Sequence, residues 1–343
     1  MSALVCHAPH DLRIENLPAE PLGPHQLRVR VAYGGICGSD LHYYHQGGFG
    51  TVRIQQPMVL GHEVSGVVAE TGSAIEGLKA GDPIAISPSR PCGACRYCQQ
   101  GMQNHCLDMR FYGSAMRMPH VQGAFRHELV IDQGQAHLLP AGFDLSLAAM
   151  AEPLSVGLHA IQRAGSVFGK QVLVTGCGPI GALLVGSLRR AGAAHIVAVD
   201  LAARPLECAR AMGADETVNL KDQPDGLQRF AGNKGHFDVM FEASGSDHAL
   251  RNGLEVVRPR GVIVSIGLGG ESKLPLNALV GKELELRGTF RFHDEFAVAV
   301  KYLSQGLVDA RPVISHIVDF EQAGSAFELA SDKAQAMKVQ LKF

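Results

Sequence analysis

The chain has 343 residues, of which 46% are hydrophobic, and this length is sufficient for two domains with their own cores. Its formal net charge is −2, which disfavours a nucleic-acid partner. No basic leader precedes an apolar stretch and no run of about 18 apolar residues occurs, so we expect a cytoplasmic protein without a membrane span.

The first 140 residues or so are predicted to form a β-rich unit with long loops. Short segments rich in β-branched residues occur at 27–33, 63–70 and 83–87, and Gly and Pro separate them. This pattern is typical of strands joined by turns.

From about residue 145 the pattern changes to helices that alternate with strands. Residues 144–164 have helical spacing, and helix-like segments at 182–193 and 203–214 separate strand-like runs. The strands are predicted at 171–175, 195–200, 216–219, 237–242, 261–266 and 285–288. Such alternation predicts an α/β fold with a doubly wound parallel sheet.

After about residue 289 the alternation ends. We expect a helix at 294–305 and a final strand at 338–343 that returns to the first unit.

A glycine-rich turn follows the first strand of the predicted parallel sheet. It fits G-x-G-x-x-G and contains Gly176, Gly178, Pro179, Ile180 and Gly181. The helix that begins there offers N–H groups to a pyrophosphate. Asp200 ends the next strand, where a carboxylate accepts hydrogen bonds from ribose hydroxyls and favours NAD over NADP. Arg204 weakens this preference, because an arginine can bind a 2′-phosphate. An ordinary strand-to-helix turn is the alternative.

Four cysteines, Cys92, Cys95, Cys98 and Cys106, lie within fifteen residues. Four thiolates close a tetrahedral zinc site, which is therefore structural. An iron–sulfur cluster or a redox pair is the alternative, but the spacing differs from the ferredoxin pattern.

Three further residues are candidates for an open, catalytic zinc site. Cys37 lies in Gly-Ile-Cys-Gly-Ser-Asp, His62 in Gly-His-Glu, and Glu152 in Ala-Glu-Pro-Leu. Each residue by itself is weak evidence for a metal ligand. Three such ligands together would leave the fourth coordination position of a zinc ion open for a substrate oxygen.

The segments GGICGSDLHYY, PMVLGHEVSG, AEPLSVGLHA and VLVTGCGPIG, with the four-cysteine region, occur in this order. Together they resemble the zinc-dependent medium-chain dehydrogenases, in their polyol (sorbitol dehydrogenase-like) branch. The resemblance covers essentially the whole chain. It implies a GroES-like catalytic domain at 1–150 and 290–343, with a zinc lobe at about 88–110, and a Rossmann domain at 151–289.

The resemblance also implies two zinc ions per chain. Cys37 and His62 would bind the catalytic one, and either Glu63 or Glu152 would be the third ligand. Zinc lowers the pKa of the substrate hydroxyl, and NAD accepts the hydride. Ser39 would contact the reacting oxygen and His42 would pass its proton to solvent.

Five residues are implied to contact the substrate. Arg291 and Phe292 would face the substrate and the nicotinamide, and Arg291 would pair with a carboxylate if the substrate is an aldonate. Tyr43, Phe111 and Ser114 would complete the pocket, although loop packing explains Phe111 and Ser114 nearly as well.

The segments DMRFYGSAMRMPHVQGAF and GTFRF resemble those of the sugar-acid dehydrogenases within this branch. This resemblance implies L-idonate, oxidised to 5-dehydro-D-gluconate, as the substrate, with sorbitol and xylitol as the alternatives. A non-catalytic nucleotide-binding protein is the alternative of another class. Relatives suggest a homo-oligomer, either a dimer or a tetramer.

Overall fold

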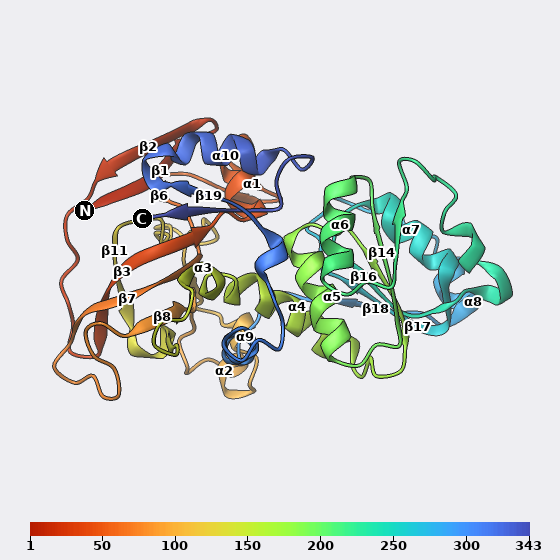
Figure 1. Ribbon diagram of the computed structural model, residues 1–343, viewed down its shortest axis with the longest axis horizontal. Helices are drawn as coiled ribbons and strands as arrows, with labels where there is room; N and C mark the ends of the chain where they lie inside the picture. The colour runs from red at the N-terminus through yellow and green to blue at the C-terminus, as the bar shows by residue number, and fades with distance from the viewer.

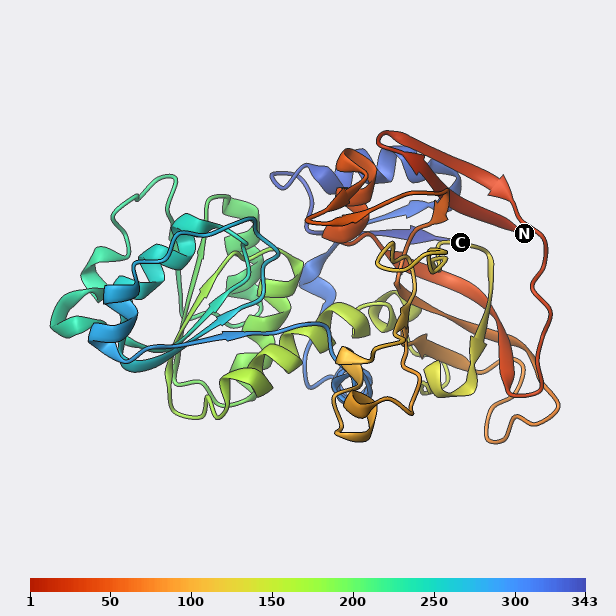
Figure 2. The same cartoon turned by 180° about the vertical axis from the view of Figure 1, so that it is seen from behind.

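The computed structural model describes all 343 residues and has two parts (Figure 1). A β-rich part is formed by both ends of the chain and contains both termini, and the middle of the chain forms a second part around a parallel sheet. Helix α4 (Ala151–Ala164) lies between them, as the reverse view also shows (Figure 2). The fold is therefore the predicted combination of a β-rich unit and an α/β unit.

The main sheet of the β-rich part has seven strands and includes the C-terminal strand. In spatial order they are β12 (Ala136–Leu138), β8 (Pro83–Ile86), β7 (Glu63–Thr71), β3 (Gln26–Gly35), β20 (Lys338–Lys342) and β19 (Ile314–Asp319), with β11 (Glu128–Asp132) also paired to β3. The central strand β3 buries Leu27, Val29 and Val31 on one face, as the two-residue period of a strand requires.

The end of the chain returns to the first unit, as expected. In the antiparallel pair of β20 with β3, Leu341 lies opposite Gly34. Two elements before β20 were not predicted, namely β19 and helix α10 (Ala323–Ser331). Strand β19 is only half-buried and pairs in parallel with β20, so its own sequence carries little hydrophobic alternation.

Smaller sheets and helices surround the seven-stranded sheet. The short strands are β1 (Ser2–Ala8), β2 (Asp11–Asn16), β4 (Gly48–Phe49), β5 (Val52–Arg53), β6 (Met58–Val59), β9 (Ser89–Arg90) and β10 (Arg110–Phe111). The helices are α1 (Gly38–Gln46), α2 (Arg96–Gln99) and α3 (Leu145–Ala148). Helix α1 was not predicted, because its mostly polar sequence lacks a clear apolar stripe.

The second part contains a six-stranded sheet in which all neighbouring strands are parallel. In spatial order they are β15 (Glu216–Asn219), β14 (His195–Asp200), β13 (Gln171–Thr175), β16 (Phe237–Glu242), β17 (Val257–Ser265) and β18 (Glu285–Gly288). The helices are α5 (Pro179–Arg190), α6 (Ala203–Ala211), α7 (Asp247–Val256) and α8 (Leu276–Lys282), and α9 (Glu295–Ser304) follows the sheet. This is the predicted doubly wound arrangement.

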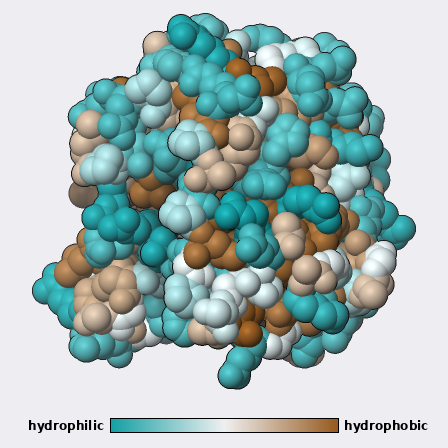
Figure 3. All heavy atoms as spheres, turned by 90° about the vertical axis from the view of Figure 1, so that its left-hand side faces the viewer, coloured by the Kyte–Doolittle hydropathy of each residue, from teal (hydrophilic) through white to brown (hydrophobic).

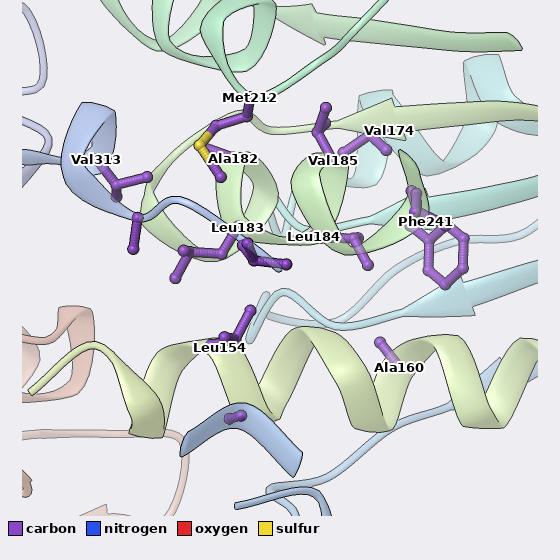
Figure 4. Packing of buried hydrophobic residues seen from close by; sticks show 14 of the residues in the cluster. Leu154, Ala160, Val174, Ala182, Leu183, Leu184, Val185, Met212, Phe241 and Val313 are labelled. Atoms are coloured by element: carbon purple, nitrogen blue, oxygen red, sulfur yellow. The ribbon is translucent and has the colours of Figure 1, made fainter. Parts of the chain in front are cut away.

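One hydrophobic core joins the two parts. Leu154 and Ala160 of α4 face Leu183 and Leu184 of α5 (Figure 4). The same cluster contains 39 buried residues, including Phe111 of the β-rich part. The predicted helix at 144–164 is divided into α3 and α4, with two residues in a turn between them.

The surface of the β-rich part, seen end-on in Figure 3, is largely hydrophilic, with apolar side chains interspersed. The chain has no helix with the length and hydrophobicity that a bilayer crossing requires.

Candidate active site

The glycine-rich turn joins β13 to α5 and has the geometry of a phosphate-binding loop. Gly176 has a φ of 83°, and an added Cβ would lie 2.5 Å from the backbone nitrogen of Ser244. A Cβ on Gly181 would collide with the carbonyl oxygen of Gly176. At Gly178 an added Cβ would meet open space, and no side chain caps the helix there. The N–H groups at the start of α5 therefore remain available to a pyrophosphate.

Asp200 lies at the end of β14. Its carboxylate is held beside this turn by hydrogen bonds from three backbone N–H groups. Its Oδ2 accepts a hydrogen bond from the N–H of Cys177 at 2.7 Å. Its Oδ1 accepts from the N–H groups of Leu201 at 2.7 Å and Ala202 at 3.1 Å. A carboxylate has about four acceptor positions, so capacity remains for a ribose hydroxyl. Arg204 is exposed nearby on α6.

The four cysteines of the zinc lobe converge and form no disulfide. Their sulfurs lie 3.6 Å apart for Cys95 and Cys98, and 4.0 Å apart for Cys95 and Cys106 and for Cys92 and Cys98. Four ligands about 2.3 Å from a zinc ion lie about 3.8 Å from one another in a tetrahedron. The N–H of Cys92 also donates to Cys106 Sγ at 3.1 Å, as is usual for thiolates. The cluster therefore fits a structural zinc.

A second group brings together Cys37, His62 and Glu63. Cys37 precedes α1, and His62 and Glu63 lie at the start of β7. Their ligand atoms all lie within 4.8 Å of one another. His62 Nδ1 and Glu63 Oε2 are buried without a hydrogen-bond partner, which is costly unless a cation or another partner is bound there. These residues fit a metal ion.

Two buried charged residues support this group and were missed by the sequence reasoning. Asp40 Oδ2 accepts from the N–H of Cys37 at 3.0 Å, and Asp40 Oδ1 accepts from the N–H of Gly61 at 3.1 Å. Lys338 Nζ donates to Glu63 Oε1 at 2.7 Å and to the carbonyl of Ile36 at 3.0 Å. The position of Asp40, three residues after Cys37, matches a capping box and was a usable signal. Nothing in the sequence around Lys338 indicates its partner.

Glu152 lies in the first turn of α4 and is buried near the same group. Burial raises its pKa to about 8; His62 lowers it, and the nearby Glu63 and Cys37 raise it. Glu152 is not among the three residues whose ligand atoms lie mutually within 4.8 Å. Burial likewise raises the pKa of the Cys37 thiol to about 11. A cation would relieve the crowding of these acidic groups.

Ser39 and His42 lie on α1, directly after Cys37. The hydroxyl of Ser39 interacts with Cys37 and lowers its pKa, against the larger effect of burial. His42 is half-buried, and burial, followed by the charges of Lys333 and His45, lowers its pKa. A neutral, half-buried imidazole can accept a proton.

A cavity of about 170 Å³ has in its wall Phe111, whose ring contacts His62 of the metal-binding group. Its lining includes Phe111, Ser114 and Arg291. The Phe111 ring centroid is 5.5 Å from that of His62. Tyr43 is buried, and its hydroxyl accepts a hydrogen bond from the N–H of Ala115 at 3.0 Å. Three of the five predicted substrate residues thus line one cavity.

Arg291 carries a charge into this cavity. Its guanidinium lies 4.0 Å from the ring centroid of Phe111, and its Nη2 lies 3.3 Å from Met116 Sδ. Burial lowers its pKa to about 10, while Glu152 and Tyr43 raise it, so Arg291 stays positive at neutral pH. A partly buried cation without a carboxylate partner in the chain is suited to an anionic ligand.

Phe292 lies elsewhere than predicted. Its side chain is fully buried, and its ring stacks on Phe296 with centroids 5.8 Å apart, inside the hydrophobic core. Arg291 adopts a positive φ of 53°, so the next side chain turns away from the cavity. Phe292 therefore packs in the core and does not line the cavity.

Both parts of the chain match known protein families. Residues 23–141 match the alcohol dehydrogenase GroES-like domain, and residues 179–305 match the zinc-binding dehydrogenase family. The chain is 46% identical to L-idonate 5-dehydrogenase (NAD(P)(+)) of Escherichia coli K12, covering 92% of this chain and 91% of that protein. It is 33% identical to sorbitol dehydrogenase of Bacillus subtilis, covering 99% and 96%.

The solved structure of L-idonate 5-dehydrogenase from Escherichia coli K-12 has the same fold. It matches with a TM-score of 0.94 at 42% identity, covering 100% of this chain and 98% of that one.

Proposed function

Because the chain belongs to the zinc-dependent medium-chain dehydrogenases, in their polyol (sorbitol dehydrogenase-like) branch, we propose that it oxidises L-idonate at C5. The product would be 5-dehydro-D-gluconate, the reaction would be reversible, and NAD would be the cofactor. The observation that carries this proposal is the cavity lined by the cationic Arg291 and by Phe111, whose ring contacts His62 of the metal-binding group. The name of the similar Escherichia coli enzyme also supports the substrate.

The carboxylate of the substrate would pair with Arg291, which lines the cavity and has no carboxylate partner of its own. A guanidinium binds a carboxylate through two parallel hydrogen bonds, which fixes orientation as well as position. Tyr43, Phe111 and Ser114 would contact the hydroxyl groups along the rest of the substrate molecule. This arrangement would present one secondary alcohol to the metal-binding group.

Zinc, when bound by Cys37, His62 and Glu63, would supply a Lewis acid that lowers the pKa of the reacting hydroxyl. Glu63 is the preferred third ligand because its Oε2 is buried without a partner. Glu152, which is buried near these residues, is the alternative third ligand. Asp40 and Lys338 would hold the ligands in place through the bonds to Cys37, Gly61 and Glu63.

The alcohol loses a hydride and a proton, and different residues would handle each. The pyrophosphate of NAD would bind at the start of α5, with its adenosine ribose at Asp200, and NAD would accept the hydride. Ser39 would take the hydroxyl proton and His42 would pass it to solvent.

A substrate panel with NAD tests this proposal. L-idonate, gluconate, sorbitol and xylitol would be compared by kcat/KM, and L-idonate is expected to be the best substrate. Negligible turnover of L-idonate beside rapid turnover of sorbitol would favour the alternative, a sorbitol- or xylitol-type polyol dehydrogenase.

A non-catalytic nucleotide-binding protein is the alternative of another class. Cys37→Ala would abolish turnover if the chain is the proposed enzyme, and would leave its function intact if it only binds a nucleotide. NAD binding, measured in the same variant, is the control.

We further propose two zinc ions per chain, one at Cys37, His62 and Glu63 and one at the four cysteines. Metal analysis should find two zinc ions in the native protein and one in Cys98→Ala.

We also propose a catalytic domain at 1–150 and 290–343 and a Rossmann domain at 151–289. The eight free cysteines favour the cytoplasm, where thiols stay reduced.

A homo-oligomer is the proposed assembly. Three apolar side chains near the edge strand β18 are exposed: Leu276 by 67%, Val280 by 77% and Leu286 by 42%. A second copy of the chain is the partner that we propose for this edge.

A further inference from the structure

The four-cysteine lobe, residues 88–110, contacts the segment that carries Arg291. Asn104, in the short 3₁₀ turn Gln103–His105, is buried, and its Nδ2 donates to the carbonyl oxygen of Phe290 at 2.9 Å. The ring of the next residue, His105, stacks on Phe290 with centroids 5.9 Å apart and an interplanar angle of 27°. The hydrogen bond joins residues 186 positions apart.

The segment held by this bond has an unusual backbone. Arg291 has a φ of 53°, a left-handed conformation that residues other than glycine rarely adopt. Such a conformation persists only where the surroundings hold it. The carbonyl that accepts from Asn104 belongs to the peptide immediately before Arg291, so this bond restricts the direction in which Arg291 leaves the backbone.

The same lobe also forms a wall of the cavity. Cys106, Leu107 and Met109 line it together with Arg291 and Phe111. The guanidinium of Arg291 lies 4.0 Å from the ring centroid of Phe111 and 5.0 Å from that of Phe290. A shift of the Phe290–Arg291 peptide would therefore move the guanidinium out of the cavity.

We propose that Asn104 is a positioning residue for substrate binding: it fixes the Phe290–Arg291 peptide so that Arg291 meets the carboxylate of a sugar acid. The inference rests on the proposed function, which assigns the carboxylate to Arg291. It gives the four-cysteine lobe a part in substrate selection besides its part in folding.

The test compares L-idonate with L-iditol, which has a hydroxymethyl group in place of the carboxylate. Their dissociation constants would be measured by calorimetry on the NADH-loaded enzyme. Asn104→Leu keeps the volume of the side chain and removes the donor. Loss of the hydrogen bond to the Phe290 carbonyl, which orients Arg291, should weaken L-idonate binding about fivefold to tenfold and leave L-iditol binding within about twofold.

Two variants complete the design. Gln103→Ala changes the neighbouring residue, which makes no bond to Phe290, and should leave both dissociation constants unchanged. Asn104→Asp keeps the size of the side chain and provides a second donor-free variant if Asn104→Leu loses zinc from the lobe, as determined by metal analysis.

Arg291→Ala distinguishes a failure of this inference from a failure of the proposed function. If Arg291→Ala loses the preference for L-idonate and the Asn104 variants also lose it, the inference stands. If only Arg291→Ala loses it, Asn104 does not position Arg291 and the inference is overturned. If Arg291→Ala keeps the preference, the carboxylate site of the proposed function is wrong, and the inference fails with it.

Discussion

Single charged side chains decide how the metal-binding group is held. Lys338 is buried in β20, and its ammonium is paired with Glu63, 275 residues away. Buried charges are tolerated only when they are paired, and removal of one partner leaves the other uncompensated. Lys338 therefore balances the negative charge of Glu63 inside the site.

Lys338→Met should make the protein depend more strongly on zinc. We expect a loss of about 3 kcal/mol in unfolding free energy in the metal-free protein and a smaller loss with zinc, which would compensate Glu63 instead. Chemical denaturation with and without a chelator measures both. Lys342→Met, at the exposed end of the same strand, is the control. Equal losses in the two forms would contradict this compensation.

Asp200 has both a structural and a recognition role, because the same carboxylate binds the turn and would bind ribose. Asp200→Gly should shift the ratio of kcat/KM for NAD over NADP toward NADP by at least about tenfold, since a repulsive charge is lost. Asp215→Gly is a matched control, because Asp215 also accepts from a backbone N–H, that of Ile196. A shift of similar size in both variants would show a general loss of structure instead.

At the scale of elements, α4 connects the two parts and α9 packs against it. His159 of α4 and Glu295, the first residue of α9, are linked by a hydrogen bond of 2.9 Å between Nδ1 and Oε1. Glu295 Oε2 also accepts from the N–H of His293 at 3.0 Å. Although burial alone would raise it, the pKa of Glu295 is lowered to about 2 by these bonds.

This pair should contribute stability above the ordinary pKa of a glutamate and lose it in acid. Because the pKa in the folded state is lowered, the contribution is complete above about pH 4.5 and disappears as the pH falls toward 2. Glu295→Gln should therefore cost about 2 kcal/mol at pH 7, and less below pH 4.5.

Urea denaturation of the wild type and Glu295→Gln across this range measures the difference, with Glu321→Gln, an exposed position, as the control. A difference that stays the same between pH 7 and pH 3 would contradict the prediction.

For the whole molecule, the parallel sheet ends in an open edge. Strand β18 is outermost in the six-stranded sheet, and Leu276 and Val280 of α8, the helix that precedes it in the chain, are exposed. An edge of this kind tends to pair with another strand unless it is covered. Pairing of two copies about a two-fold axis would cover both edges at once.

Light scattering after size exclusion should therefore give a mass of at least about twice the 36.5 kDa of one chain. Val280→Glu with Leu286→Glu should reduce it to that of a monomer, because two charges would be buried. Phe168→Glu, which changes an apolar residue that is 79% exposed elsewhere, should leave the assembly intact. A monomeric native protein would exclude this interface.

The sequence was sufficient where a feature depends on neighbours along the chain. The strands at 171–175, 195–200, 216–219, 237–242 and 285–288 have the predicted bounds. The glycine turn and the four cysteines are also local, because a tight turn and a closed zinc site each draw on residues a few positions apart.

The tertiary structure alone decided which distant residues meet. It grouped Glu63 rather than Glu152 with Cys37 and His62, paired Lys338 with Glu63, joined Asn104 to Phe290 and buried Phe292 in the core. Such contacts depend on how sheets and helices pack, and no spacing along the chain encodes them. The class of chemistry was therefore determined by the sequence, whereas the arrangement of the charges around the site was determined by the packing of the two parts.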